Sequence, residues 1–177
     1  NDAAEDAVTL YRRILARQPD RGVTVVTVGF LTNLANLLNS PADKISPLTG
    51  RELVQRKVKQ LVSMAGKFPA GHEFNVFKDA GAARYAFAEW PTPVIFSGFE
   101  IGERIKTGLP LVQNATLRPH PAQDVFRISI PLDPVDKQGR MSWDQTAVLV
   151  AVLGAEPFYS LKTGRITIDE KGNNGWD

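Results

Sequence analysis

Residues 61–79, LVSMAGKFPAGHEFNVFKD, join an apolar run to a loop rich in glycine and proline, and then to a polar pair among aromatic residues. The run at residues 61–65 has the length and the flanking turn signals of a buried strand. Gly66, Pro69 and Gly71 interrupt the apolar pattern, so the loop is expected at the C-terminal end of that strand. In open α/β sheets that edge is where ligands bind.

The polar pair in this stretch is Glu73 and Asn75. The alternation in residues 73–77 predicts an extended segment, with Glu73 and Asn75 on one face and Phe74 and Val76 on the other. A carboxylate and an amide that point the same way can hold vicinal hydroxyls of a sugar, because each can make two hydrogen bonds. The alternative is a solvated loop that carries these residues as surface polar groups.

Strand and helix signals alternate on both sides of this stretch. Apolar residues recur at helical spacing in some segments, and short runs of β-branched or apolar residues separate them. The predicted elements are a helix at 3–16, a strand at 23–28, a helix at 30–38, a helix or extended segment at 51–59, a helix at 80–90 and a strand at 94–99. This order predicts an α/β fold with an open, mainly parallel sheet and helices on both faces.

A second polar candidate lies in residues 140–154, RMSWDQTAVLVAVLG. Ser142 and Gln145 have the spacing of a capping box, which predicts a helix that ends at Gly154 and carries Asp144 in its first turn. A carboxylate in that position complements the helix dipole, and this is the alternative to a role in binding. Trp143 is by default a core or lid aromatic.

Two further segments have weaker signals. Residues 159–162 and 165–168, on either side of Thr163 and Gly164, predict a hairpin. Residues 102–124 carry three prolines and few periodic apolar positions, and they are expected to form a mobile or inserted segment.

Composition narrows the range of functions. A chain of 177 residues that is 43% hydrophobic and 23% charged predicts a single globular domain over residues 1–177. The net charge is +2 with basic residues scattered, which argues against a nucleic-acid partner, and no apolar run is long enough for a membrane span. The absence of cysteine excludes thiolate chemistry.

His72, beside Glu73, is either a general acid or base or an inert loop histidine. His120 is the second of the two histidines in the chain, and two are too few for a histidine-based metal cluster.

Four segments form an ordered set over residues 27–154: TVGFLTNLANLL at 27–38, LVSMAGKFPAGHEFNVFKDAGAARYAF at 61–87, PVIFSGFEIG at 93–102 and SWDQTAVLVAVLG at 142–154. This set resembles the inosine-uridine preferring nucleoside hydrolase family. The matching family patterns are G-P-L-T-N, M-G-G followed by E-F-N and D-x-x-A-A-R, and a late H-D pair that opens a helix. The resemblance is strongest to a bacterial branch that carries Trp-Asp in place of His-Asp.

The resemblance implies a Ca²⁺-dependent hydrolase that removes the base from a ribonucleoside by adding water at the anomeric carbon, through a transition state like an oxocarbenium ion. The implied calcium ligands in this chain are the carbonyl of Val28 and the carboxylate of Asp144. The residues implied to contact the nucleoside are Met64, Glu73, Asn75 and Trp143.

This chain departs from the family pattern in three places. The family's N-terminal D-x-D-x-x-x-D-D cluster, which supplies the remaining calcium carboxylates and the base that activates water, has no counterpart. The chain is therefore expected to be a partial domain, truncated at both ends, with little or no hydrolysis of its own. The loop between Met64 and Glu73 is short and lacks an asparagine that often contacts ribose, for which His72 is a candidate substitute. Trp143 can stack on a base but cannot donate a proton to it at neutral pH.

Two alternatives to nucleoside hydrolysis stay open. One is a non-catalytic sugar- or nucleoside-binding protein that keeps the polar pair without the metal. The other is a hydrolase of a different N-glycoside, which Trp143 suggests. Family members are commonly dimers or tetramers, so a homo-oligomer is an expectation of the resemblance. The sequence leaves the compartment open, and the resemblance favours a periplasmic or secreted protein over a cytoplasmic one.

Overall fold

The computed structural model describes residues 4–177, and its centre is a parallel sheet of three strands. The strands are β1 (Val23–Thr27), β2 (Val58–Met64) and β4 (Val94–Ser97), in the order β1-β2-β4. In this register Thr27 lies opposite Ser63, and Met64 lies opposite Ser97. All three strands therefore end at the same edge, and the predicted open parallel sheet is confirmed.

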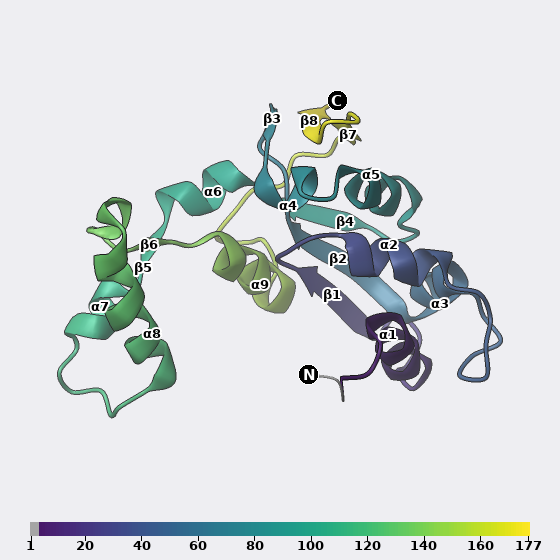
Figure 1. Ribbon diagram of the computed structural model, residues 1–177, viewed down its shortest axis with the longest axis horizontal. Helices are drawn as coiled ribbons and strands as arrows, with labels where there is room; N and C mark the ends of the chain where they lie inside the picture. The colour runs from purple at the N-terminus through teal and green to yellow at the C-terminus, as the bar shows by residue number, and fades with distance from the viewer. Residues whose placement is uncertain (1–3) are drawn as a thin grey trace.

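Helices cover both faces of the sheet, as predicted (Figure 1). Leu61 of β2 belongs to a large core with the helices α1, α2, α3 and α5, whereas Val62 and Met64 pack on the opposite side against α9. This split follows from the alternation of side chains along a strand. The helices are α1 (Ala7–Ala16), α2 (Thr32–Asn39), α3 (Gly50–Lys57), α5 (Ala80–Glu89) and α9 (Trp143–Leu153).

The first helix is fixed at its start and along its length. Asp6 caps it by accepting from the amide of Thr9, and the predicted start at residue 3 lies outside the described residues. Arg12 is buried beneath the loop between α2 and α3, where it pairs with Asp43 at 2.9 Å and donates to the carbonyl oxygens of Ser46 and Leu48. A buried guanidinium needs this full set of acceptors.

Two local predictions, one in the central stretch and one at the start of α9, were wrong. Residues 74–77 are not extended, because Glu73 begins a one-turn helix, α4 (Phe74–Phe77). The short strand β3 (Ala70–His72) precedes it. At the start of α9 the capping box of Ser142 and Gln145 does not form, since the Ser142 side chain caps nothing. The predicted helix itself and its end at Gly154 are confirmed.

The predicted hairpin at 159–168 was also wrong. Residues 159–164 are not a strand, and the hairpin lies further on, between β7 (Ile166–Ile168) and β8 (Asn173–Trp176). β3 adds to β8 as a third antiparallel strand. The turn signal at Thr163 and Gly164 does not produce a hairpin, because residues 165–168 pair with residues 174–177 instead of with 159–162.

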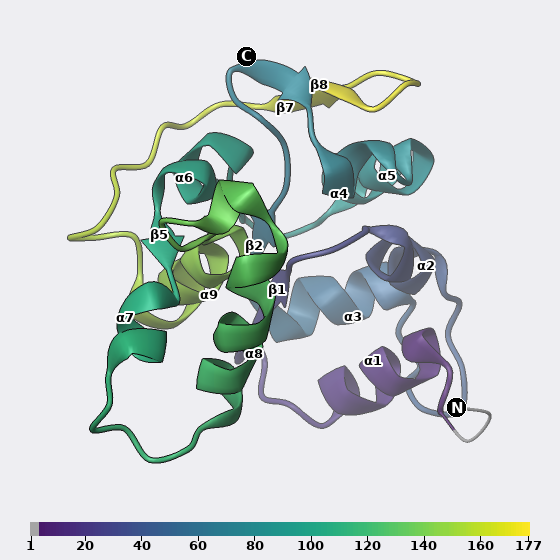
Figure 2. The ribbon, with the colours of Figure 1, turned by 60° about the vertical axis from the view of Figure 1, so that its left-hand side comes forward.

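The segment expected to be loose contains short helices. α6 (Phe99–Arg104) follows β4 directly. Residues 106–140, here called the arm, then contain β5 (Lys106–Thr107), α7 (Leu109–Gln113), α8 (Pro121–Ser129), the 3₁₀ turns η1 (Ile130–Leu132) and η2 (Pro134–Asp136), and the start of β6 (Arg140–Met141). The arm returns through the β5–β6 pair and extends away from the sheet (Figures 1 and 2). Within residues 4–177 no helix has the length and apolar character needed to cross a membrane.

Candidate functional site

The C-terminal edge of the sheet gathers most of the residues singled out from the sequence. Val28 follows β1, and Met64 is the last residue of β2. The N-terminal turn of α9, with Asp144, lies at the same edge, because the hydroxyl oxygens of Thr146 in α9 and Ser97 in β4 are 2.7 Å apart. Segments more than a hundred residues apart therefore meet at one edge, where parallel sheets bind ligands.

A cavity of about 470 Å³ opens where β1 passes into α2. It is lined by Val26, Thr27, Val28, Gly29 and Phe30, by the start of α2, and by Tyr11 of α1. Val28 is 41% exposed here, and a Cβ on Gly29 would meet no atom within 4 Å. The backbone around Val28 is thus open to a ligand.

Glu73 is buried, and its carboxylate is occupied by backbone groups. It accepts hydrogen bonds from the amides of Asn75 at 2.9 Å, Gly66 at 3.1 Å and Val76 at 3.3 Å. Burial raises the pKa of Glu73, while these amides act in the opposite direction. This carboxylate joins the end of β2 to the start of α4. The alternation had predicted a Glu73 side chain free to bind a sugar, but its oxygens are bonded to the backbone instead.

Asn75 is held against the end of β2. Its amide nitrogen donates to the carbonyl oxygen of Met64 at 3.0 Å and lies 3.2 Å from the Met64 sulfur. The structure shows no hydrogen-bond donor to the Asn75 Oδ1 among residues 4–177. The expected neighbours Met64, Glu73 and Asn75 are thus brought together, with one amide oxygen still able to accept a hydrogen bond.

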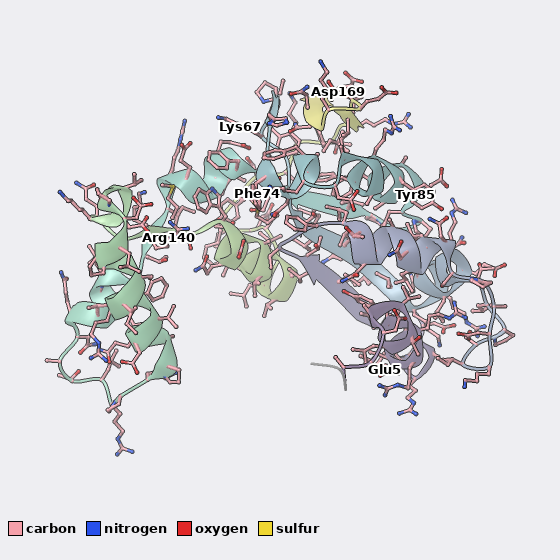
Figure 3. The ribbon with its side chains drawn as sticks, in the orientation of Figure 1. Glu5, Lys67, Phe74, Tyr85, Arg140 and Asp169 are labelled. Carbon is pink, nitrogen blue, oxygen red and sulfur yellow. The ribbon has the colours of Figure 1, made fainter. Side chains whose placement is uncertain are left out.

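An exposed aromatic pair lies beside these groups and was missed by the sequence reasoning. The rings of Phe30 and Phe74 are 5.7 Å apart and are 49% and 53% exposed. Figure 3 shows Phe74 on α4, above the ends of the central strands. Val76 is buried together with Glu73 and Asn75, so the alternation of a strand breaks at Val76. Glutamate is not among the residues preferred at an N-cap, so the sequence carries no strong signal for this turn.

Trp143 and Asp144 open α9 beside α6 and the arm. The ring of Trp143 stacks on Phe99 at 5.2 Å, its Nε1 donates to the Phe99 carbonyl at 3.0 Å, and the Arg140 guanidinium lies 5.6 Å from its centroid. Asp144 is exposed, but partial desolvation raises its pKa and the charge of Arg140 opposes this. Trp143 is thus half-buried against Phe99 and Arg140, whereas the Asp144 side chain is exposed.

His72 lies away from these groups, in the β3–β8 ladder. Its ring stacks on Phe77 at 4.1 Å, and its Nε2 is 3.2 Å from the carbonyl oxygen of Lys171. These contacts hold the ring in the ladder, and the role of His72 as a general acid or base stays a prediction.

The oxygen donors at this edge are of the kind that calcium prefers, but they are too few. Calcium takes six to eight oxygens, and Val28 and Asp144 would supply one carbonyl and one carboxylate. Nowhere in residues 4–177 do three His, Cys, Asp or Glu side chains gather as a metal site. These residues therefore do not fit a complete calcium site by themselves.

Comparison with known proteins agrees with this arrangement. The family described as inosine-uridine preferring nucleoside hydrolase matches residues 1–174. A pyrimidine-specific ribonucleoside hydrolase, RihA, from Enterobacter sp. (strain 638) is 33% identical over 103 residues, which cover 55% of this chain and 29% of that protein. The chain thus matches less than a third of the length of that relative. The chain belongs to the inosine-uridine preferring nucleoside hydrolase family.

Proposed function

We propose that this chain provides the nucleoside-binding edge of an enzyme that hydrolyses the N-glycosidic bond of ribonucleosides to a base and ribose. The family membership supports the reaction class. The observation that carries the proposal is the free Oδ1 of Asn75, fixed at the end of β2 by the bond from its Nδ2 to Met64. An acceptor held in this way binds a sugar hydroxyl with little loss of side-chain freedom.

Each group at the edge has a role in this proposal. Asn75 accepts a hydrogen bond from a ribose hydroxyl, and Met64 lies under the sugar. Glu73 holds Asn75 and the loop in position through the backbone amides that it accepts. Phe30 and Phe74 offer exposed rings against which a base or sugar face can stack. Trp143 contacts the base only if Arg140 moves from its ring.

Calcium enters the proposal as a cofactor for which Val28 and Asp144 supply two donors. Bound calcium supplies an acidic water molecule, which is the nucleophile that such a hydrolysis needs. Because calcium takes six to eight oxygens, most of its ligands have to be groups other than Val28 and Asp144. We therefore expect the 177-residue chain to bind calcium weakly and to release little ribose.

The test measures the affinity of the chain for inosine, 2′-deoxyinosine and 3′-deoxyinosine by titration calorimetry. Wild type is expected to bind inosine about fivefold to tenfold more tightly than one of the deoxy analogues, which is the value of one hydrogen bond. Asn75→Ala is expected to lose this preference. Asn36→Ala is the matched control, because Asn36 is an exposed residue of α2.

The ratio of the affinities for inosine and its deoxy analogues does not depend on a small change in the folded fraction, so a destabilised variant can still be compared with wild type. Equal affinity of the wild-type chain for all three nucleosides would contradict the role of Asn75. Circular dichroism of each variant checks that it is folded.

A non-catalytic nucleoside-binding protein is the second candidate. It is favoured by the incomplete set of calcium donors among residues 4–177. Adding a chelator to the titrations separates the binding protein from the hydrolase. An affinity for inosine that the chelator leaves unchanged favours the binding protein. Release of ribose that stops when calcium is removed favours the hydrolase. The nucleoside preference and the activity on other N-glycosides follow from the same assay with uridine and nicotinamide riboside.

A further inference from the structure

The free edge of β4 faces a second and larger cavity, of about 580 Å³. Within residues 4–177, β4 is the last strand of the sheet and pairs only with β2. All four of its residues line this cavity, and residues 159–164, which belong to no helix or strand, line it as well. The cavity is separate from the opening beside β1 and shares no residue with it.

Backbone groups of β4 point into this space without partners. The amide of Leu61 in β2 donates to the carbonyl of Pro93 at 2.9 Å, so the backbone groups of Pro93, just before β4, face β2. Because the amide and carbonyl of one residue point to the same side, and successive residues alternate, those of Val94 and Phe96 face away from β2. The structure shows no hydrogen bond to these groups from any residue in the range 4–177.

The carbonyl of Val94 and the amide of Phe96 are therefore an adjacent acceptor and donor at an open edge. In a parallel sheet this pair binds the amide and carbonyl of a single residue of the next strand. A flat ring that carries a donor beside an acceptor in its own plane can replace that residue. Val94 and Phe96 are half-buried, and a ligand that pairs both groups gains two hydrogen bonds in a partly enclosed space.

The walls of the cavity suit a flat aromatic ring. Phe68, Phe96 and Trp176 form one side, with ring centroids 5.3 Å apart for Phe68 and Trp176 and 6.0 Å apart for Phe96 and Trp176. Ile101 and Val150 line the other part of the cavity. The volume lies in the usual range for small-molecule sites.

A charged acceptor also lines the cavity, where β4 ends. Glu100 accepts from the amide of Phe68 at 3.0 Å through its Oε2, and its Oε1 lies so close to Gly98 that a Cβ there would be 2.3 Å away. The absence of a side chain at Gly98 thus makes room for the carboxylate. A second donor on a ligand would find this acceptor.

We infer that this cavity binds a planar nitrogen heterocycle with adjacent donor and acceptor atoms, such as a free purine or pyrimidine base, on the edge of β4. The ring lies between the aromatic wall and Ile101 and Val150. Its donor binds the carbonyl of Val94, and its acceptor binds the amide of Phe96. The site does not depend on the proposed hydrolase activity.

The experiment is a titration of the ¹⁵N-labelled chain with adenine, followed by the amide signals of each residue. The amide of Phe96 is expected to shift on binding. N6,N6,9-trimethyladenine keeps the ring but has no N–H donor on either edge, and it is expected to bind about tenfold more weakly, the value of one buried hydrogen bond. Ile101→Phe fills the cavity and is expected to abolish the shift, whereas Leu153→Phe, at an exposed position outside the lining, leaves it unchanged.

Four outcomes would overturn the inference. One is the absence of any shift at Phe96. The second is a set of shifts confined to Val28, Phe30 and Asn75, which would place the base at the proposed nucleoside site and support that proposal instead. The third is slow hydrogen exchange of Val94 and Phe96 without ligand, which would mean that residues 159–164 already pair with the edge. Equal binding of both adenines would exclude the donor–acceptor pairing.

Discussion

Glu73 shows how one residue fixes the geometry of the candidate site. Its carboxylate accepts from the amides of Gly66, Asn75 and Val76, so the loop after β2 and the turn of α4 share one anchor. Gly66 adopts a φ of 81°, which L side chains rarely adopt, and this lets the chain turn towards Glu73. Asn75 is in place because Glu73 holds its backbone.

Replacement of Glu73 should therefore change stability in a pH-dependent way. Because burial raises the pKa of Glu73 above 4.5, folding favours the protonated carboxyl. Its contribution is fully present below pH 4.5 and is lost as the pH rises through the raised pKa. Urea unfolding should show the free energy of unfolding of wild type falling with pH relative to that of Glu73→Gln, which has no charge to titrate. A constant difference between the two proteins would contradict this.

Glu73→Ala measures how much the Glu73 carboxylate contributes to the free energy of unfolding. It leaves the three backbone amides without an acceptor, and we expect the free energy of unfolding to fall by about 2–3 kcal/mol. A loss below about 0.5 kcal/mol, the level of an ordinary surface substitution, would show that water replaces the carboxylate.

At the scale of elements, the contact between α6 and α9 positions the start of α9 and thus Asp144. A Cβ on Gly102 in α6 would lie 2.4 Å from the Cα and 2.6 Å from a ring carbon of Trp143. The Trp143 indole nitrogen is bonded to the carbonyl of Phe99 in the same helix. A glycine is thus required where the two helices meet.

Two glycine-to-alanine substitutions should have opposite effects. Gly102→Ala is expected to lower the free energy of unfolding by about 2 kcal/mol, because the backbone of Trp143 has to move. Gly81→Ala in α5 meets only one atom, at 4.0 Å, and should raise it by about 0.5–1 kcal/mol through helix propensity. Thermal and urea unfolding of both variants check this, and the same sign for both would contradict the close packing at Gly102.

At the scale of the whole molecule, the arm buries much less side-chain surface than the sheet and the helices that cover it. β2 is buried along most of its length, and the large core surrounds it. α8 in the arm has no buried residue, and Val125 and Ile128 are 62% and 65% exposed. The arm joins the rest through the short β5–β6 pair and α6 (Figure 1).

Hydrogen exchange should therefore separate the two regions. Segments that bury little surface open at low free-energy cost, so the amides of α8 are expected to exchange at least about a hundredfold faster than those of β2. Mass spectrometry of peptides from each region measures this. Equal protection would mean that another surface covers α8.

Much of this organisation was predictable from the sequence, because it depends on local signals. β-branched and apolar runs predicted the strands at 23–28 and 94–99 within one or two residues, and helical spacing predicted α5. The helix α9 was predicted with its end at Gly154, although the capping box expected at its start does not form. Parallel strands separated by helices place Val28, Met64 and Asp144 at one edge. The resemblance to the family is confirmed by the match over residues 1–174.

Tertiary contacts alone decided the direction of the Glu73 carboxylate, the covering of Trp143 and the pairing of β8. Asn174 bonds to both backbone groups of Lys67, 107 positions away, and Arg140 covers a ring that Phe99 supports from another helix. No local pattern encodes such partners. The sequence by itself determined the elements and the family, because periodicity and motifs are properties of neighbouring residues. The structure decided which polar atoms remain free for a ligand, because that depends on which distant groups already bind the others.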